Sequence, residues 1–238
     1  MINITAMSDI HGKLIDVKGK ADLFIICGDI SPLEIQSYGL SMGHWLELEF
    51  VPWVNSLPYK DENSKCILVA GNHDFVFKDF VDSKRNRSIQ GSRLEELSDR
   101  IVYLENEEYI FKKGDTEYKI FGCPYCQELR GWAFCEPKEQ LIERYSHIPN
   151  DTDILVLHDA PDILDGGLAV DYHRINFGNK LLADRIKEVK PKLTLFGHIH
   201  SSPIKEVTEF EEGCSLCNVC IVDEDYIERW KPRKINLS

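Results

Sequence analysis

A hydrophobic run long enough to cross a bilayer is missing from this 238-residue sequence. The longest apolar runs, Leu23–Cys27 and Ile154–Leu157, fall far short of the roughly 20 apolar residues that a transmembrane helix needs. The opening stretch, Met1-Ile-Asn-Ile-Thr5, also lacks the basic patch and the long apolar core of a signal peptide. We therefore expect a cytoplasmic protein that has no membrane partner.

Basic side chains are also scarce. The sequence has 28 Lys and Arg against 40 Asp and Glu, which gives a formal net charge of −12. Proteins that bind long nucleic acids or anionic membranes need clustered positive charge, so the sequence argues against both partners. A role that involves small anions would need positive charge from outside the chain.

The eight cysteines are the one apparent excess. A chain of this length can bury a full core without disulfides, so we expect reduced and mostly buried thiols. Two local patterns leave an alternative open, because paired cysteines at such spacings can hold zinc or act in redox chemistry. These patterns are Cys123-Pro-Tyr-Cys126 and Cys214-Ser-Leu-Cys217-Asn-Val-Cys220.

Short apolar runs typical of strands recur along the chain, and several are separated by segments with helical spacing. Strands that alternate with helices, together with stretches of strands alone, predict an α/β layered fold with a mixed sheet or two packed sheets. No linker or internal repeat interrupts the pattern, so we expect residues 1–238 to form a single domain. The expected strands are Ile2–Met7, Leu23–Cys27, Cys66–Ala70, Glu117–Phe121, Ile154–Leu157, Leu193–Phe196, Lys205–Thr208 and Cys217–Val222.

Apolar side chains at helical spacing predict three helices, over residues 46–57, 138–145 and 181–189. Pro52 should kink or split the first helix, and Pro191 should follow the end of the third. A turn at Lys113-Gly114-Asp115 predicts a hairpin within residues 101–121.

Five of the expected strands end in residues that commonly bind metals. Ligands of α/β sheets lie beyond the carboxyl ends of the strands, so these five endings should meet in space. Taken singly, each has an ordinary explanation, such as an Asp in a turn or a buried structural His. Their concentration at strand ends has no such ordinary explanation, because five of the eight histidines fall in these endings. The endings contain Asp9 and His11; Asp29; Asn72, His73 and Asp74; His158 and Asp159; and His198 and His200.

The ordered set of motifs resembles the calcineurin-like metallophosphoesterase superfamily. The motifs are Asp9-x-His11, Gly28-Asp29, Gly71-Asn72-His73-Asp74, His158 and Gly197-His198-x-His200. The chain is most similar to small single-domain members that resemble cyclic-nucleotide phosphodiesterases. The resemblance implies a four-layer α/β/β/α sandwich of two mixed sheets flanked by helices. One departure is His158-Asp159-Ala160-Pro161, where such members usually read His-Gly-Pro-Pro, and it raises the question of what Asp159 does.

The resemblance also implies a centre of two divalent metal ions. It assigns Asp9, His11 and His200 to the first ion, Asp29 to a bridge, and Asn72, His158 and His198 to the second. Imidazole, carboxylate and amide ligands without a thiolate suit Mn, Fe or Zn. A metal-bound hydroxide would attack phosphorus in line. His73 would donate a proton to the leaving oxygen, with Asp74 orienting its imidazole ring.

These implications make a metal-dependent phosphoester hydrolase the leading hypothesis, acting on small phosphodiesters or phosphomonoesters. A catalytically degenerate metal-binding scaffold or regulatory protein is the alternative. Substrate specificity should lie in segments outside the motifs: 39–53, 75–90, 125–134 and 166–179. Tyr125, Trp132 and Phe134 could stack on a substrate, although burial in the core is the simpler expectation for each.

Overall fold

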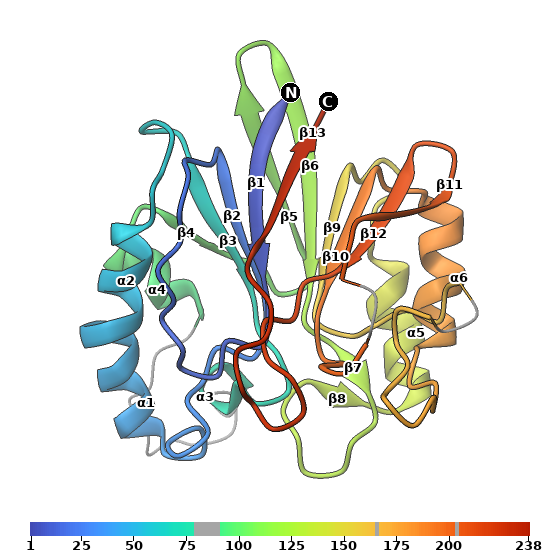
Figure 1. Cartoon of the computed structure of the whole chain (residues 1–238), viewed down its shortest axis with the longest axis horizontal. Helices are drawn as coiled ribbons and strands as arrows, with labels where there is room; N and C mark the ends of the chain where they lie inside the picture. The colour runs from blue at the N-terminus through green and yellow to red at the C-terminus, as the bar shows by residue number, and fades with distance from the viewer. Residues whose placement is uncertain (79–90, 165–166, 203–204) are drawn as a thin grey trace.

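The computed structural model describes residues 1–78, 91–164, 167–202 and 205–238, with the side chains of all but residues 91–93. Its strands form two large sheets (Figure 1). In the first sheet only the edge strand β13 runs antiparallel to its neighbour. The order of strands in this sheet is β13 (Arg233–Leu237), β1 (Ile2–Met7), β2 (Leu23–Cys27), β3 (Lys65–Val69) and β4 (Ile101–Tyr103).

The second sheet is parallel in the middle and antiparallel at both edges. A separate pair of short parallel strands, β7 (Cys126–Gln127) and β8 (Cys135–Glu136), follows the hairpin strand β6. The order in the large sheet is β11 (Thr208–Glu211), β12 (Cys214–Asn218), β10 (Leu193–Phe196), β9 (Ile154–Leu157), β6 (Thr116–Cys123) and β5 (Glu107–Lys113).

The two sheets pack face to face, and the alternation of side chains along their strands builds two cores. Ile25 and Val156 point into the apolar layer between the sheets. Their neighbours Phe24 and Leu155 point outward into the layer that the helices cover. One group of helices covers the first sheet and another covers the second, which confirms the expected α/β/β/α sandwich (Figure 1). The groups are α1 (Gly39–Trp45), η1 (Leu46–Phe50), α2 (Val51–Ser56), α3 (Phe75–Lys78) and α4 (Gly91–Leu97), then α5 (Lys138–Ser146) and α6 (Lys180–Val189).

Local sequence signals explain where the helices begin and end. Asn179 caps the N-terminus of α6, because its side chain accepts a hydrogen bond from the Leu182 N–H. Lys190, in the left-handed region just before Pro191, caps the C-terminus. The expected break near Pro52 takes the form of a π-helical turn, η1, directly before α2. None of the described helices has the length and apolar character that a membrane span requires.

Two expected strands near the C-terminus are wrong in position. The segment expected as 205–208 instead forms β11 at Thr208–Glu211, an edge strand whose side chains are mostly half-exposed. The segment expected as 217–222 instead begins at Cys214 and leaves the sheet after Asn218. β11 was misplaced because an edge strand has no fully buried face to mark it. β12 is a buried inner strand, and its end was misplaced because the apolar run continues beyond the sheet to Val222.

Candidate metal centre

The nine predicted site residues all follow strands, and the structure brings them to one edge of the two sheets. Parallel neighbours β1, β2 and β3 carry the first group, and β9 and β10 of the second sheet carry the rest. Hydrogen bonds between the two groups, such as the one from the His198 N–H to Asp9 at 3.1 Å, join the edges of the two sheets. Residues from both halves of the chain therefore meet at a single site.

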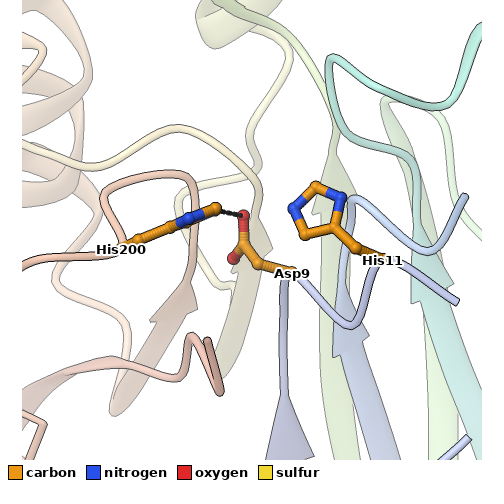
Figure 2. A group of neighbouring side chains, drawn as sticks. All are labelled: Asp9, His11 and His200. Carbon is orange, nitrogen blue, oxygen red and sulfur yellow. Dashed lines mark hydrogen bonds and ion pairs between the residues drawn. The ribbon is translucent and has the colours of Figure 1, made fainter. Parts of the chain in front are cut away.

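Asp9, His11 and His200 form one compact group, with Asp9 between the two rings (Figure 2). Their ligand atoms all lie within 4.8 Å of one another. The Nε2 atom of His200 lies 3.1 Å from Asp9 Oδ1. This group contains the three residues that the resemblance assigns to the first ion.

A second group contains Asp9, Asp29 and His158, whose ligand atoms also lie within 4.8 Å of one another. His158 Nε2 lies 3.4 Å from Asp29 Oδ2 and 3.0 Å from Asn72 Oδ1. Asp29 Oδ2 also lies 4.0 Å from His11 Nε2, so this carboxylate faces both groups. That position suits a bridging ligand.

His198 is less tightly placed than the other predicted ligands. Its ring packs edge-on against His158, with ring centres 5.0 Å apart. Its ring belongs to neither compact group of ligand atoms. The assignment of His198 to the second ion therefore stays a prediction.

The backbone at the site adopts a conformation that residues other than glycine rarely take. Asp9, His11, Asp29 and His198 have φ angles of 56°, 40°, 54° and 68°. Each such residue costs on the order of 1–3 kcal/mol, and strained residues of this kind cluster at functional sites. Four strained residues among the predicted ligands thus support a functional site here.

Glycines at two strand ends allow the carboxylates to approach the backbone. A Cβ atom on Gly71 would lie 2.2 Å from Asp29 Oδ1. A Cβ atom on Gly197 would lie 2.0 Å from Ser8 Oγ and 2.3 Å from Asp9 Oδ2. Any larger residue at either position would displace a predicted metal ligand.

The ring nitrogens at the site fit a metal centre. The Nδ1 atom of His158 donates to the backbone carbonyl of Cys27 at 2.8 Å. The Nδ1 atom of His200 donates to the backbone carbonyl of Asp223 at 3.1 Å. Both Nε2 atoms therefore turn unprotonated lone pairs toward the carboxylates when the rings are neutral. Both ring nitrogens of His11 are buried without a hydrogen-bond partner among the described residues. A buried, unpaired imidazole is costly unless a cation binds it, so the donor set fits divalent ions.

Charge coupling within the site follows from its burial. Burial alone would raise the pKa of Asp29, but His158 outweighs it and holds this pKa well below its usual range. Burial likewise opposes the charged form of His158, yet Asp29 raises its pKa to about 10. Burial lowers the pKa of His11 to about 4, so this ring is neutral at physiological pH. An ionised Asp29 and a neutral His11 are the forms that bind a metal, whereas His158 must release a proton when an ion binds.

His73, the predicted proton donor, is oriented by Gln36 rather than by Asp74. The His73 Nδ1 atom lies 2.6 Å from Gln36 Oε1. Asp74 instead accepts hydrogen bonds from the N–H groups of Ser31 (3.0 Å) and Gly71 (2.8 Å) and from the Ser31 hydroxyl. The expected contact between Asp74 and His73 is therefore wrong, because Asp74 ties the loop after β2 to the loop after β3.

A pocket of about 620 Å³ opens over the site. Two of the segments expected to set specificity line it, through residues such as Leu129 and Phe177. Residues 39–53 do not line this pocket and are almost entirely helical, so their assignment to a specificity loop is wrong. Residues 79–90 and 166 of the other expected segments lie outside the described part of the chain.

The three aromatic residues near this pocket differ in how deeply they are buried. Tyr125 and Phe134 are buried in the core, as the simpler expectation held. Trp132 is 38% exposed, and its ring centre lies 4.4 Å from that of His73. Trp132 is thus the aromatic residue of the three that faces the site.

Asp159 has a structural role. Its oxygens accept from the Gln127 N–H at 3.0 Å, from Asn179 Nδ2 at 2.7 Å and from the Ala160 N–H at 3.0 Å. The carboxylate therefore joins the end of β9 to β7 and to the start of α6.

The cysteines are free thiols, and all but Cys135 are buried, as expected for seven of the eight. The groups of possible metal ligands among the described residues contain no cysteine. In the register of β7 and β8, Cys126 lies opposite Cys135 and not opposite Cys123. Burial raises the pKa of Cys123 to about 12, which keeps that thiol protonated. The alternative of a cysteine zinc or redox module gains no support.

Three residues around the site lie outside the sequence motifs: Gln36, Cys220 and Tyr226. Cys220 donates to Asp9 Oδ2, with the sulfur 2.8 Å from the oxygen. The ring centre of Tyr226 lies 4.8 Å from that of His11. None of the three follows a Gly- or His-containing strand end. The cysteine pattern marked Cys220 only as a possible zinc or redox residue, and no sequence signal marked Gln36 or Tyr226.

A model of the calcineurin-like phosphoesterase family matches residues 2–202. The chain is 28% identical over 235 residues to "Probable rhamnogalacturonate lyase C" of Emericella nidulans, covering 97% of this chain and 20% of that protein. It is 26% identical over 230 residues to human metallophosphoesterase domain-containing protein 1, covering 90% of this chain and 65% of that protein. The chain thus spans less than two thirds of either relative.

Among solved structures, the fold is similar to phosphopantetheinyl hydrolase from Mycobacterium tuberculosis, with a TM-score of 0.58 and 15% identity. The match covers 98% of this chain and 95% of that chain. At this identity the similarity supports the architecture of the two sheets and does not extend to a substrate.

Proposed function

The chain belongs to the calcineurin-like phosphoesterase family, and on that premise we propose that it hydrolyses small phosphate esters at a centre of two divalent metal ions. The observation that carries this proposal is the pair of ligand groups, Asp9–His11–His200 and Asp9–Asp29–His158, which share Asp9. Asp29 of the second group also lies 4.0 Å from His11 of the first. Such a juxtaposition is what a two-metal hydrolase needs, since its ions lie about 3.5–4 Å apart.

In this proposal Asp9, His11 and His200 hold the first ion, and Asn72, His158 and His198 hold the second, with Asp29 between them. Mn, Fe and Zn all suit these ligands. Bound divalent ions would polarise phosphoryl oxygens and acidify a water molecule near neutral pH.

The chain itself supplies the proton for the leaving oxygen through His73, which lines the pocket. Gln36 accepts from the Nδ1–H of this ring, which leaves Nε2 to face the site, 3.9 Å from Asp29 Oδ2. Burial lowers the pKa of His73, and the nearby Asp29 carboxylate opposes this shift. A hydrogen-bond acceptor at Nδ1 also stabilises the doubly protonated ring that a proton donor needs. Trp132 shields one side of His73 from water.

The substrate in this proposal is a small diester or monoester, because the acidic chain disfavours long polyanions. The pocket volume of about 620 Å³ is in the range of sites for small organic molecules. We place the protein in the cytoplasm, a location that its free thiols suit.

A metal-binding scaffold without catalysis is the competing function. Degenerate members of an enzyme family usually lose a ligand or the proton donor. The predicted ligands and His73 are all present in this chain. This completeness favours hydrolysis.

The test is metal analysis and turnover after reconstitution with Mn, Fe, Zn, Ni or Co. We expect two ions per chain, and hydrolysis within a panel of mono-, di- and cyclic phosphate esters. Asp29→Ala should lose metal, whereas His73→Ala should keep both ions and lower kcat by roughly 10²–10⁴. His44→Ala, at an exposed position on α1, is the matched control. Two bound ions without hydrolysis of any ester would favour the scaffold.

A further inference from the structure

The segment after the last motif, Cys220–Trp230, lies beyond the residues that the family model matches. It forms a compact turn that Asp223 organises. The Asp223 N–H donates to the Ile227 carbonyl at 2.9 Å, and Asp223 Oδ1 accepts from the Ile227 N–H at 2.9 Å. An ion pair between Asp223 and Arg229 closes the turn. We refer to residues 220–230 as the C-terminal turn.

The first contact of the C-terminal turn is to Asp9. The backbone of Cys220 pairs with Ser8, the residue before Asp9, through a parallel bridge. The Cys220 thiol, almost completely buried, lies 2.8 Å from Asp9 Oδ2. The N–H of His198 lies 3.1 Å from the same oxygen. With Oδ2 occupied by these donors, Oδ1 is the oxygen that faces His200.

The second contact is to His200. The carbonyl of Asp223 accepts a hydrogen bond from His200 Nδ1 at 3.1 Å. This contact sets the tautomer and leaves Nε2 toward Asp9. The turn thus orients a second residue of the same ligand group.

The third contact is to His11, which has no hydrogen-bond partner for either ring nitrogen among the described residues. Metal-binding histidines are usually oriented by a hydrogen bond at the second nitrogen. Here Tyr226 packs edge-on against the His11 ring, at 4.8 Å between centres and an interplanar angle of 88°. Tyr226 also packs edge-on against His200 at 5.3 Å and holds a φ angle of 58°. Ring packing therefore replaces the missing hydrogen bond.

Asp9 lies in both compact groups of ligand atoms but is assigned to the first ion, and the residues assigned to the second ion take their support from elsewhere. His158 Nδ1 donates to the carbonyl of Cys27 in β2. The Asn72 carbonyl accepts from the Ala133 N–H at 3.2 Å, in the segment between β7 and β8. The Asp29 Oδ1 atom accepts from the His73 N–H at 2.8 Å. None of these supports comes from the C-terminal turn.

We propose that the C-terminal turn controls the first metal position alone, with Cys220, Asp223 and Tyr226 as positioning residues for Asp9, His200 and His11. The inference rests on the two-ion centre of the proposed function. Outer partners of metal ligands change metal affinity by about 10–100-fold. Weakening the turn should therefore weaken one ion by that factor and leave the other unchanged.

The test measures Mn and Zn binding by calorimetry and by metal analysis after dialysis, with Co absorption spectra as a readout independent of activity. Cys220→Ala and Tyr226→Leu should each weaken one of the two sites by roughly 10–100-fold, so that dialysis leaves one ion per chain. Cys220→Ser restores a hydrogen-bond donor, and Tyr226→Phe restores the ring, so both should keep two ions. Cys214→Ala in β12 and Tyr172→Ala, 67% exposed, are the matched controls.

The outcomes separate this inference from the proposed function. If the unmodified chain binds fewer than two ions, the two-ion centre itself fails. If the unmodified chain binds two ions, and the Cys220→Ala and Tyr226→Leu variants bind both ions as tightly as it does, the role of the turn is refuted. Equal loss of both ions would refute its selectivity. Thermal unfolding of the metal-free variants identifies any that fail to fold. If one substitution prevents folding, the other residue still tests the role of the turn, through Cys220→Ala with Cys220→Ser or through Tyr226→Leu with Tyr226→Phe.

Discussion

At the scale of single residues, His73 depends on a partner that no motif contains. Gln36 lies in the stretch between β2 and α1, and its Oε1 atom is 2.6 Å from His73 Nδ1. Asp74, although adjacent in sequence, accepts from the Ser31 N–H in the loop after β2 and from the Gly71 N–H in its own loop. The proposed proton donor is thus oriented by a neutral amide, which adds no charge beside Asp29.

Replacing Gln36 should slow the reaction without removing metal. Gln36→Ala frees the His73 ring to rotate, and we expect kcat to fall by roughly 10–100-fold, as for other partners of site histidines. Gln140→Ala, exposed on α5, should have no effect. Steady-state kinetics and metal analysis on the same samples check this prediction. An unchanged kcat in Gln36→Ala would show that His73 needs no such partner.

The grouping of the nine predicted site residues at one edge of the sheets could be foreseen from the sequence, because each follows a strand, where an apolar run ends in a polar pattern. Gln36, Cys220 and Tyr226 could not. Their side chains reach the site from loops, and a loop carries no periodicity that fixes the direction of a side chain. The Asp74 contact failed for a related reason, since adjacency in a turn does not decide which donors a carboxylate meets.

At the scale of elements, the carboxylate of Asp159 connects β9, β7 and α6. It accepts hydrogen bonds from Gln127, Asn179 and Ala160 and is almost completely buried. Removing it leaves these buried donors unpaired.

Asp159→Ala should therefore lower the free energy of unfolding by about 1–3 kcal/mol. The two bound ions should remain, because Asp159 is not part of either ligand group. Asp162→Ala is the control, since Asp162 accepts from Asn176 in an exposed contact. Urea denaturation of the metal-free proteins measures the change, and loss of an ion on the substitution would contradict the structural role.

Strands were predictable where both faces are buried. β1, β2, β9 and β10 have the expected bounds, because strands buried on both faces read as continuous apolar runs. β11 was misplaced because none of its side chains is fully buried, and β12 because its apolar pattern continues past the sheet into the C-terminal turn. Tertiary contacts, such as the bridge between Ser8 and Cys220, end β12 and have no local signature.

At the scale of the whole molecule, Asp22 ties the two sheets together. Its side chain is buried just before β2, and Lys113 at the end of β5 reaches it at 2.8 Å from the other sheet. Burial alone would raise the pKa of Asp22, but Lys113, the Asn3 N–H and Lys60 hold it below its ordinary value of 3.8.

Asp22→Asn should destabilise the protein by about 1–3 kcal/mol at neutral pH. Because the folded-state pKa of Asp22 is lowered, the stabilisation is present above pH 3.8 and is lost as the pH falls through the lowered value. The difference between the two proteins should therefore narrow below about pH 3.8. Urea unfolding across that range measures it, with Asp16→Asn in an exposed ion pair as the control. A difference that grows toward acid pH would contradict the assignment.

The net charge sets a further expectation for the whole molecule. Two divalent ions would offset only four of its twelve excess negative charges. A single-stranded oligonucleotide should meet repulsion from the surface, whereas the monoanion bis(p-nitrophenyl) phosphate should feel mainly the local field of the metals. We expect kcat/KM for the oligonucleotide to be lower than kcat/KM for the small ester. The oligonucleotide value should rise when salt increases from about 0.01 M to 0.15 M, because the screening length shortens from about 30 Å to 8 Å. The small ester should change little over the same range. If salt instead weakened turnover of the oligonucleotide, a basic surface would have to guide it, and the restriction to small substrates would be wrong.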